Sequence, residues 1–475
     1  MTVSRTRGRL ARTASTLALA LAAALAIPTA AHAAPPASTT PVAAGRTAGI
    51  TTPDGRTFIA DQSGRALELH GFNAGKNGRV SAADVQEMAA KGQNFLRLVV
   101  MWQYIEPKQG QYDQAYLAYI NSVLTAADKA GVHVMIDMHQ DVYGPAFGSN
   151  GIPAWATRTD GLPFQADPDN WFNGYFQPAV MRAFTHLYND ADLQKAQEDL
   201  WVTVAKSVQN HQSLLGYDLF NEPFGEFQDG EDYPTASARI EQTDLTPMYN
   251  RVIKAIRTVD RTSWMFVEPT VLVGYGVPTQ LGKIDDSRVG YAPHFYDTSV
   301  EDGADWDPSN GFVENYEAAI SLYATENKMP LIVGEWGPPN SRTPGNSALV
   351  AAQVASMERF ATGWSMWYWC KSDHGGYCAM DAAGNPAPGD EPAFGPYAAA
   401  TAGIPGSEHY DATTGAYALT YTAGAGSTEI FVPTSVYGSK PVIAVTGGQP
   451  HYDATKQLLR ITAKPGTAVS VTLGK

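Results

Sequence analysis

The stretch GYDLFNEPFGEF, residues 216–227, holds the pattern that decides the fold. It completes an apolar run, Leu214–Phe220, that delivers Asn221 and Glu222 and then stops at Pro223. Proline has no backbone N–H, so it is typical of the end of a strand rather than its interior. Nearly continuous hydrophobicity is typical of parallel strands covered on both faces. The stretch therefore predicts a buried strand that presents an amide and a carboxylate at its carboxyl end.

Seven further apolar runs share this character and alternate with stretches of helical periodicity. The runs are Leu67–Phe72, Phe95–Val100, His133–His139, Trp264–Glu268, Gly290–Tyr296, Leu331–Glu335 and Gly363–Trp369. Between the runs, segments such as Gln114–Lys129 and Leu193–Asn210 place apolar residues every three or four positions. Eight strands that alternate with helices predict an α/β fold, the (β/α)₈ TIM barrel. A doubly wound open sheet is the alternative, and the number of repeats favours a closed barrel.

The ends of the chain differ from this central part. Four arginines precede the apolar run Leu17–Ile27, and Ala31-His32-Ala33 fits a cleavage site, so residues 1–33 predict a signal peptide and secretion. Residues 34–45, rich in Ala, Pro and Thr, predict a disordered leader. Residues 46–400 are assigned to the barrel. Short alternating strands separated by Gly, Pro and Asp predict a small all-β sandwich over residues 401–475.

The charge of the chain limits its partners. The net charge is −14, and loss of the four signal-peptide arginines makes it about −18. A strongly acidic surface repels nucleic acid and anionic membranes, so we expect no nucleic-acid partner, at most peripheral contact with membranes or lipid micelles, and a monomer. Cys370 and Cys378, the two cysteines, are expected to form a disulfide in an exported chain, with free thiols as the alternative.

The carboxyl ends of the predicted strands carry the candidate site, because chemistry in such barrels collects there. Two carboxylates, Glu222 and Glu335, arrive from the fourth and seventh strands. The same ends supply Arg97, Asp137, His139, Asp141, Asn221, His294, Tyr296 and Trp367. Paired carboxylates suit glycoside hydrolysis, in which one acid protonates the leaving oxygen and the other attacks or stabilises the anomeric carbon. Asp137, His139 and His294 are expected to contact the substrate. The structural alternatives are an interior ion pair for Arg97, core positions for the two histidines and a supporting role for Asp137.

The motifs at these strand ends resemble those of a known family. Asn221-Glu222-Pro223, His294-x-Tyr296 and Gly334-Glu335-Trp336-Gly337 are similar to the pattern of glycoside hydrolase family five. Gly71-Phe-Asn73-Ala-Gly-Lys76 and Asp137-Met-His139-Gln-Asp141-Val-Tyr143 resemble the endoglycoceramidases, secreted enzymes that release intact oligosaccharide from the ceramide of glycosphingolipids. The resemblance covers about Gly45 to Ala400 and, more loosely, the sandwich.

The resemblance implies a role for each site residue. Glu222 is expected to be the acid/base and Glu335 the nucleophile, held ionised by Arg97 and the Tyr296 hydroxyl. Asn221 would bond the sugar 2-hydroxyl, Lys76 and Asp141 would bond hydroxyls of the first sugar, and Trp367 would stack under it, with Trp369 in the core. No metal and no organic cofactor is expected.

Several functions remain open on the sequence. One is a preference for glycolipids whose first sugar is galactose; another is a secreted β-glucanase or β-mannanase, which would use the same catalytic residues. A carbohydrate-binding protein that has lost catalysis is the alternative from another class, although both carboxylates are present.

Two loops are candidates for the lipid side of the substrate. The aromatic segment between Gln140 and Leu193 and the apolar segment Val271–Pro278 both follow strands at the catalytic end. Long loops in compact domains are often functional. We expect an apolar groove for the ceramide there, with Leu272 and Val273 facing it; packing of these loops on the barrel is the alternative.

Overall fold

The computed structural model describes residues 49–475, and the predicted signal peptide and leader lie outside these residues. Among the described residues, no helix combines the length and the hydropathy needed to cross a bilayer.

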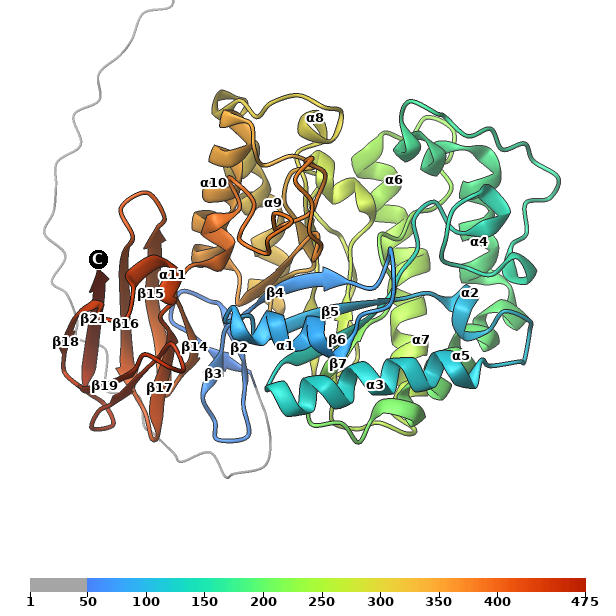
Figure 1. The fold of residues 1–475 in the computed structure, drawn as a ribbon. Coiled ribbons are helices and arrows are strands. Elements are labelled where there is room, and N and C mark those ends of the chain that lie inside the picture. The colour runs from blue at the N-terminus through green and yellow to red at the C-terminus, as the bar shows by residue number, and fades with distance from the viewer. Residues whose placement is uncertain (1–48) are drawn as a thin grey trace, which may run out of the picture. The chain divides into compact units, whose positions relative to one another are not determined.

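Eight parallel strands form the central sheet (Figure 1). In chain order they are β4 (Leu69–Ala74), β5 (Phe95–Val100), β6 (His133–Met138), β7 (Leu214–Asp218), β8 (Trp264–Val267), β9 (Val289–Tyr291), β11 (Ile332–Val333) and β13 (Gly363–Met366). From β4 to β9 each strand pairs with the next, β11 pairs with β13, and β13 pairs with β4. A parallel bridge between Tyr291 and Leu331 joins the two remaining edges, so the sheet closes. This confirms the predicted (β/α)₈ barrel.

Helices surround the strands. They are α1 (Ala82–Ala90), α3 (Gln114–Ala130), α5 (Ala191–Val208), α7 (Thr246–Ile256), α9 (Phe312–Asn327) and α10 (Pro344–Phe360). Local sequence fixes their starts: Ser81 and Asp84 form a capping box before α1, and the Asp113 side chain accepts two backbone N–H groups at the start of α3. Further helices lie in the loops: α2 (Trp102–Ile105), α4 (Pro178–Asn189), α6 (Tyr233–Ile240) and α8 (Thr298–Glu301).

Two of the predicted strands are each divided, and the division shapes the catalytic end. After β9, the chain forms β10 (His294–Phe295), and after β11 it forms β12 (Glu335–Trp336). Pro293, which has no N–H for the ladder, separates β9 from β10. β10 and β12 pair in parallel with His294 opposite Glu335. The small extra sheet therefore places these two side chains next to each other.

The C-terminal part consists of two antiparallel sheets, as expected. The smaller sheet has the order β15 (Gly403–Asp411), β16 (Ala416–Ala423), β21 (Ala468–Gly474) and β18 (Val442–Thr446). The larger sheet contains β14 (Tyr397–Thr401), β17 (Ser427–Phe431), β20 (Leu458–Thr462) and β19 (Gln449–Asp453), with the short helix α11 (Thr434–Tyr437) after β17. Buried and exposed residues alternate along β16, which is the pattern of a strand with one face in a core.

Residues from the beginning of the described chain complete the larger sheet. The strands β1 (Ile50–Thr51), β2 (Thr57–Ala60) and β3 (Ala66–Leu67) precede the barrel but extend this sheet, because β3 pairs with β14. Leu67 lies opposite Ala400 in that pairing. The boundary predicted at residue 400 does not include this contribution of N-terminal strands to the C-terminal sheet.

Acidic side chains lie where the sandwich contacts the barrel. Glu68, just before β4, shares a side-chain hydrogen bond with Glu408 of β15. Glu408 also accepts the Tyr417 hydroxyl and the Ala398 N–H, both at 2.7 Å. Burial, together with repulsion by Glu68, raises the pKa of Glu408 well above its ordinary value, and burial raises the pKa of Glu68. The pair therefore retains a proton above the pH at which an exposed glutamate loses it.

Glu408→Gln is expected to stabilise the protein at alkaline pH. An acid whose pKa is raised by folding favours the folded state while protonated, so the free energy of unfolding falls as the pH rises above about 4.5 and through the raised pKa. The amide of Gln keeps a neutral partner for Glu68 at every pH. We expect the variant to match the wild type near pH 4.5 and to have a Tm about 2–4 °C higher at pH 8.

Thermal unfolding at both pH values measures this effect. Asp229→Asn, an exposed position in a turn, is the control for loss of one charge. Identical pH dependence of Tm in wild type and Glu408→Gln would contradict the shared proton.

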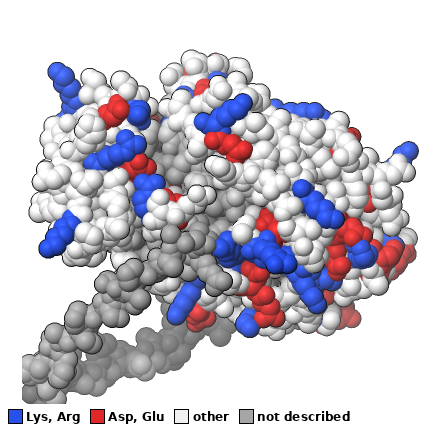
Figure 2. Space-filling view, turned by 90° about the horizontal axis from the view of Figure 1, so that it is seen from below, with Lys and Arg blue, Asp and Glu red and all other residues white. Residues whose placement is uncertain are grey.

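Surface charge is mixed on the face seen in Figure 2. Basic and acidic side chains lie interspersed over the barrel portion of that face. That face does not present the continuous basic surface that tracks a phosphate backbone. The expected absence of a nucleic-acid partner stays a prediction.

Candidate active site

Glu222 and Glu335 meet at the carboxyl end of the barrel. Glu222 lies in the loop after β7, and Glu335 begins β12. One carboxylate oxygen of each lies within 4.8 Å of the other, with a nitrogen of His294 in the same group. The strands thus bring the two predicted carboxylates to one point, as the barrel topology requires.

Glu335 is held by the two donors that the sequence pointed to. Arg97 Nη1 donates to Oε1 at 2.7 Å, and the Tyr296 hydroxyl donates to Oε2 at 3.1 Å. Burial raises the pKa of Glu335, and this opposes the expectation of a firmly ionised group; the positive charges of His294, Arg97 and His139 act in the other direction. Its ionisation therefore depends on those three cationic partners.

Glu222 sits in an unusual backbone conformation. Its φ is 43°, in the left-handed region that non-glycine residues seldom adopt. His294 Nδ1 lies 2.9 Å from Oε1, and the Tyr175 hydroxyl donates to Oε2 at 3.3 Å. The carboxylate is buried but borders the cavity described below.

Arg97 is the hub beneath both glutamates. Its fully buried guanidinium contacts Asn73, Asp137, Asp218, Asn221, Glu268 and Glu335. Four of these are carboxylates, and their attraction outweighs burial and raises the pKa of Arg97. The interior ion pair considered for Arg97 and its contact with Glu335 are thus both present. Asn221 Oδ1 accepts a hydrogen bond from Arg97. Its Nδ2 group donates one hydrogen to the Gln140 carbonyl at 2.9 Å, which leaves the second Nδ2 hydrogen available.

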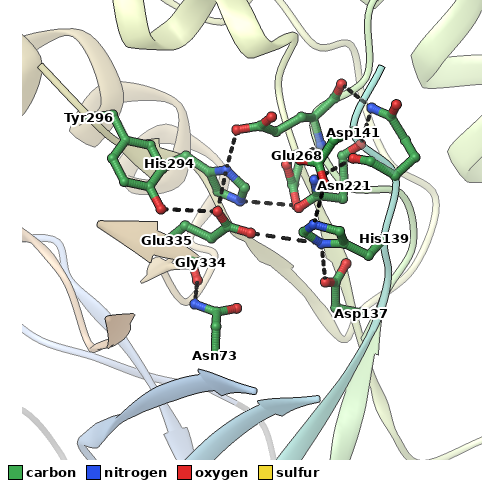
Figure 3. Close-up of polar contacts among 12 residues, drawn as sticks. Asn73, Asp137, His139, Asp141, Asn221, Glu268, His294, Tyr296, Gly334 and Glu335 are labelled. Carbon is green, nitrogen blue, oxygen red and sulfur yellow. Dashed lines mark hydrogen bonds and ion pairs between the residues drawn. The ribbon is translucent and has the colours of Figure 1, made fainter. Parts of the chain in front are cut away.

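Two histidines lie among carboxylates at the site (Figure 3). His139 lies between Asp137 at 2.7 Å and Asp141 at 3.2 Å. Burial lowers the pKa of His139, but Asp141 and Asp137 outweigh it and raise the pKa to about 9. His294 lies between Glu222, Glu268 and Glu335, which raise its pKa in spite of burial. The neighbouring carboxylates therefore favour the protonated form of both imidazoles.

Lys76, Asp141 and Trp367 form one wall of the cavity. Lys76 pairs with Asp141, and its Nζ lies 4.9 Å from the centre of the Trp367 ring. Trp367 stacks on His139 at 5.5 Å, while Trp369 packs on Phe72 in the core, as expected for Trp369. Burial disfavours ionisation of Asp141, but Lys76 and His139 outweigh it and lower the pKa of this carboxyl. This wall offers charged groups beside a flat aromatic face.

The cavity itself has a volume of about 410 Å³. Glu222, His294, Glu335 and Trp367 border it, and so do the aromatic residues Trp171, Phe172 and Tyr275. The last three come from 3₁₀ segments, Trp171–Phe176 and Val271–Tyr275, in the two loops that the sequence singled out. Trp171 and Tyr275 are 54% and 43% exposed.

The prediction for two residues of the second loop is wrong. Leu272 and Val273 are buried in the hydrophobic core of the barrel and do not face the cavity. An apolar residue in a loop reads the same whether it faces a groove or the core, so the sequence alone could not separate the two. Val271 and Tyr275 of the same loop do line the cavity.

Several polar residues of the site were not singled out from the sequence. Asp218 ends β7, Glu268 directly follows β8, and both contact Arg97. Glu301, hydrogen-bonded by the Tyr377 hydroxyl, is a third glutamate at the cavity; burial raises its pKa to about 7. Asp218 and Glu268 could have been found by asking which strand ends carry carboxylates, whereas Glu301 lies in a loop helix with no such signal. Cys370 and Cys378 form a disulfide that closes the loop carrying Tyr377.

The clustered acids and histidines do not form a convincing metal site. Three groups in the described chain have ligand atoms close enough for a metal ion: Asp137 with His139 and Glu335; Glu222 with His294 and Glu335; and Asp137 with Asp218 and Glu268. Each group contains a carboxylate already paired with Arg97. A guanidinium in that place repels a cation, so we assign these residues no metal.

A closed (β/α)₈ barrel with two facing carboxylates beside a cavity of this kind defines a glycoside hydrolase. The chain belongs to glycoside hydrolase family 5: residues 60–373 match the family described as Cellulase (glycosyl hydrolase family 5), and residues 396–473 match the glycoside hydrolase family 5 C-terminal domain.

Several proteins that are similar to this chain are named endoglycoceramidases. The chain is 31% identical over 249 residues to an endoglycoceramidase of Cyanea nozakii, covering 44% of this chain and 49% of that protein. It is 25% identical over 456 residues to endoglycoceramidase I of Rhodococcus hoagii, covering 88% and 87%. The chain thus spans about half the length of the Cyanea nozakii relative and most of the bacterial one. The structure of endo-glycoceramidase II from Rhodococcus sp. in complex with ganglioside GM3 superimposes with a TM-score of 0.79 at 29% identity, covering 88% of this chain and 99% of that one.

Proposed function

We propose that this protein is a retaining, endo-acting glycoside hydrolase that cleaves the β-glycosidic bond between the oligosaccharide and the ceramide of glycosphingolipids. The observation that carries the proposal is the pair Glu222 and Glu335, within 4.8 Å at a cavity with a charged wall and an aromatic rim. Retaining glycosidases hold their carboxyl groups about 5–5.5 Å apart, and inverting enzymes leave room for a water. The relatives named endoglycoceramidase support the substrate class.

Glu335 acts as the nucleophile in this proposal. Its carboxylate attacks the anomeric carbon and forms a glycosyl-enzyme, and the bond to the ceramide oxygen breaks. Arg97 and Tyr296 orient the carboxylate through one bond to each oxygen. Attraction by the four carboxylates around it keeps Arg97 fixed in place, so the attacking oxygen is aimed before substrate arrives.

Glu222 supplies and recovers the proton. In the first step it donates a proton to the departing oxygen, and in the second it takes a proton from the water that releases the glycan. His294 and Tyr175 contact its carboxylate and set its orientation. The second Nδ2 hydrogen of Asn221 is available for the sugar 2-hydroxyl, whose contacts strengthen in the transition state.

The two sides of the cavity suit the two halves of the substrate. Lys76 and Asp141 provide charged partners for sugar hydroxyls, and Trp367 provides a flat surface for a sugar ring. Trp171, Phe172 and Tyr275 provide the apolar surface that a ceramide needs on the other side of the glutamates. The proposed groove therefore lies in the same two loops, but it is formed by Trp171, Phe172 and Tyr275 and not by Leu272 and Val273.

Loss of the exposed aromatic groups is expected to affect glycolipid substrates selectively. We expect Trp171→Ser with Tyr275→Ser to raise the KM for a glycolipid by about 30-fold, because each removes apolar contact area worth about 1 kcal/mol. Hydrolysis of a water-soluble aryl glycoside, which has no lipid, should change less than about 2-fold. Steady-state kinetics on both substrates without detergent measure the difference.

Tyr104→Ser is the matched control for this pair. Tyr104 is 48% exposed and lies on α2 rather than at the cavity. A loss of equal size on glycolipid and aryl glycoside would contradict a lipid-binding rim.

Product analysis decides between the proposed function and its alternatives. The protein is incubated with a glucosyl-linked ganglioside, a galactosyl-linked oligosaccharide lipid and a soluble β-glucan or β-mannan. Free ceramide with intact glycan from the first supports the proposal, and cleavage of the second alone supports an endogalactosylceramidase specificity. Shortened oligosaccharides from the polysaccharide alone would replace the proposal with a β-glucanase or β-mannanase. Export through the signal peptide and a monomeric state are part of the proposal and rest on the sequence.

A further inference from the structure

Glu268 is a buried carboxylate beneath the catalytic pair. It does not line the cavity and does not contact Glu335. It follows β8 directly and is 2% exposed. The Tyr249 hydroxyl donates to the Glu268 carbonyl at 2.9 Å and accepts the Glu268 N–H at 3.3 Å. One hydroxyl on α7 therefore fixes the backbone from which this carboxylate projects.

The backbone N–H of Glu222 is bonded to this carboxylate. Oε2 of Glu268 accepts that N–H at 2.8 Å. A buried N–H needs an acceptor, and here Glu222 has the left-handed φ of 43°, outside any strand ladder that could supply one. The next residue, Pro223, has no N–H to share in the turn. The Glu268 carboxylate is thus the group that satisfies the backbone of Glu222 in this conformation.

A second connection runs through His294. Oε1 of Glu268 accepts from Arg97 Nη2 at 2.9 Å and lies 3.4 Å from His294 Nε2. The opposite nitrogen of that ring, Nδ1, lies 2.9 Å from the Glu222 carboxylate. Glu268 therefore bears on Glu222 at both its backbone and its side chain, by two independent contacts.

We infer that Glu268 is a positioning residue for proton donation by Glu222: it holds the backbone of Glu222 in its left-handed conformation and orients the imidazole against its carboxylate. The inference rests on the proposed role of Glu222 as the acid/base. Burial opposes ionisation of Glu268, but His294, Arg97 and the Glu222 N–H lower its pKa, so the carboxylate accepts with both oxygens.

Glu268→Gln separates this role from simple support of the fold. The carboxylate accepts from Glu222 and Arg97 with different oxygens, whereas the amide of Gln offers one oxygen and one NH₂ group. One of the two donors then faces another donor, and the shape of the side chain is kept. Proton donation by Glu222 should weaken while the nucleophile keeps its own partners, Arg97 Nη1 and Tyr296.

The test compares kcat/KM for phenyl β-lactoside and 2,4-dinitrophenyl β-lactoside. Dinitrophenolate leaves without a proton, whereas phenolate needs one, and general acid catalysis contributes about 10²–10⁴-fold. For Glu268→Gln we expect a loss of about 30-fold on the phenyl substrate and less than about 3-fold on the dinitrophenyl substrate. The alkaline limb of the pH profile for the phenyl substrate should also move.

Matched variants make each outcome decisive. Asp218→Asn removes a carboxylate from the same guanidinium, at Nε, without contacting Glu222, so it should affect both substrates equally. Tyr249→Phe removes the hydroxyl that holds Glu268 and should show the same selectivity as Glu268→Gln, which keeps the test available if Glu268→Gln does not fold. Equal losses on the two substrates for Glu268→Gln and Tyr249→Phe would overturn the inference. Glu222→Ala is the reference: if it shows the leaving-group dependence and the other two do not, the inference fails alone, and if it shows none, the proposed role of Glu222 fails first.

Discussion

Glu335→Ser is expected to abolish hydrolysis and to leave synthesis intact. Without the carboxylate no glycosyl-enzyme forms, and removal of a nucleophile typically costs on the order of 10⁴–10⁶-fold in kcat. Serine also leaves space at the anomeric centre. A lactosyl fluoride of α configuration places fluoride where the lost carboxylate would bond, so it imitates the intermediate. Glu222, which keeps His294 and Tyr175 as partners, then deprotonates an acceptor hydroxyl, the new β-glycosidic bond forms and fluoride leaves.

Two measurements check the expected result for Glu335→Ser. Release of phenol from an aryl β-lactoside gives the loss of hydrolysis, and mass spectrometry detects the condensed product from the fluoride and a sphingosine-type acceptor. Glu301→Gln is the matched control, because Glu301 is the third glutamate at the same cavity and contacts Tyr377 rather than Arg97. Hydrolysis by Glu335→Ser within about 10-fold of wild type would reject Glu335 as the nucleophile; loss of hydrolysis without synthesis would reject the role given to Glu222.

Glu222→Ala is expected to stop the reaction halfway. With 2,4-dinitrophenyl β-lactoside the first step needs no proton and proceeds, but the second step lacks the base that activates water, so the glycosyl-enzyme accumulates. We expect a burst of dinitrophenolate equal to the enzyme present, followed by turnover reduced by about 10²–10⁴-fold. Azide, an anion that attacks without a base, should restore turnover and give a glycosyl azide of β configuration.

Peptide mapping of the stalled enzyme locates the sugar. The added mass should lie on the peptide that contains Glu335. A mass on another peptide, or an azide product of α configuration, would exclude the double displacement. Asn221→Ala is the neighbouring control: it removes a contact to Arg97 and to the sugar but no proton donor, so it should lower the rate without a burst and without rescue by azide.

The sequence was sufficient for the barrel because its signal is physical and local. A parallel strand covered on both faces must be apolar throughout, and each of the eight runs overlaps the strand found there, with β5 at the predicted bounds. The run Gly290–Tyr296 nevertheless contains two strands, because Pro293 cannot join the ladder. The small sheet made by β10 and β12 was therefore not predicted, although it sets His294 beside Glu335.

The parts that the sequence did not reveal depend on pairing over long distances. Glu268 and Asp218 read as ordinary acids at strand ends until Arg97, from a different strand, lies between them. The strands β1 to β3 are short and border hydrophilic turns, and the partner of β3 is more than 300 residues further along the chain. Residues with a strand-end motif, such as Glu222 and Glu335, could be found; residues whose role comes from a contact with another strand could not.

The pairing of Leu67 with Ala400 has a consequence for anyone who wishes to shorten or transplant this catalyst. A cut after the last barrel strand strips β14 and, with it, the hydrogen-bonding partner of the three strands that precede the barrel, so their edge becomes available to other molecules. Ribosomal synthesis meets the same constraint, since the sheet stays incomplete until Leu458–Thr462 has been made. The smallest unit of this enzyme that can fold by itself is therefore the barrel together with the C-terminal sandwich.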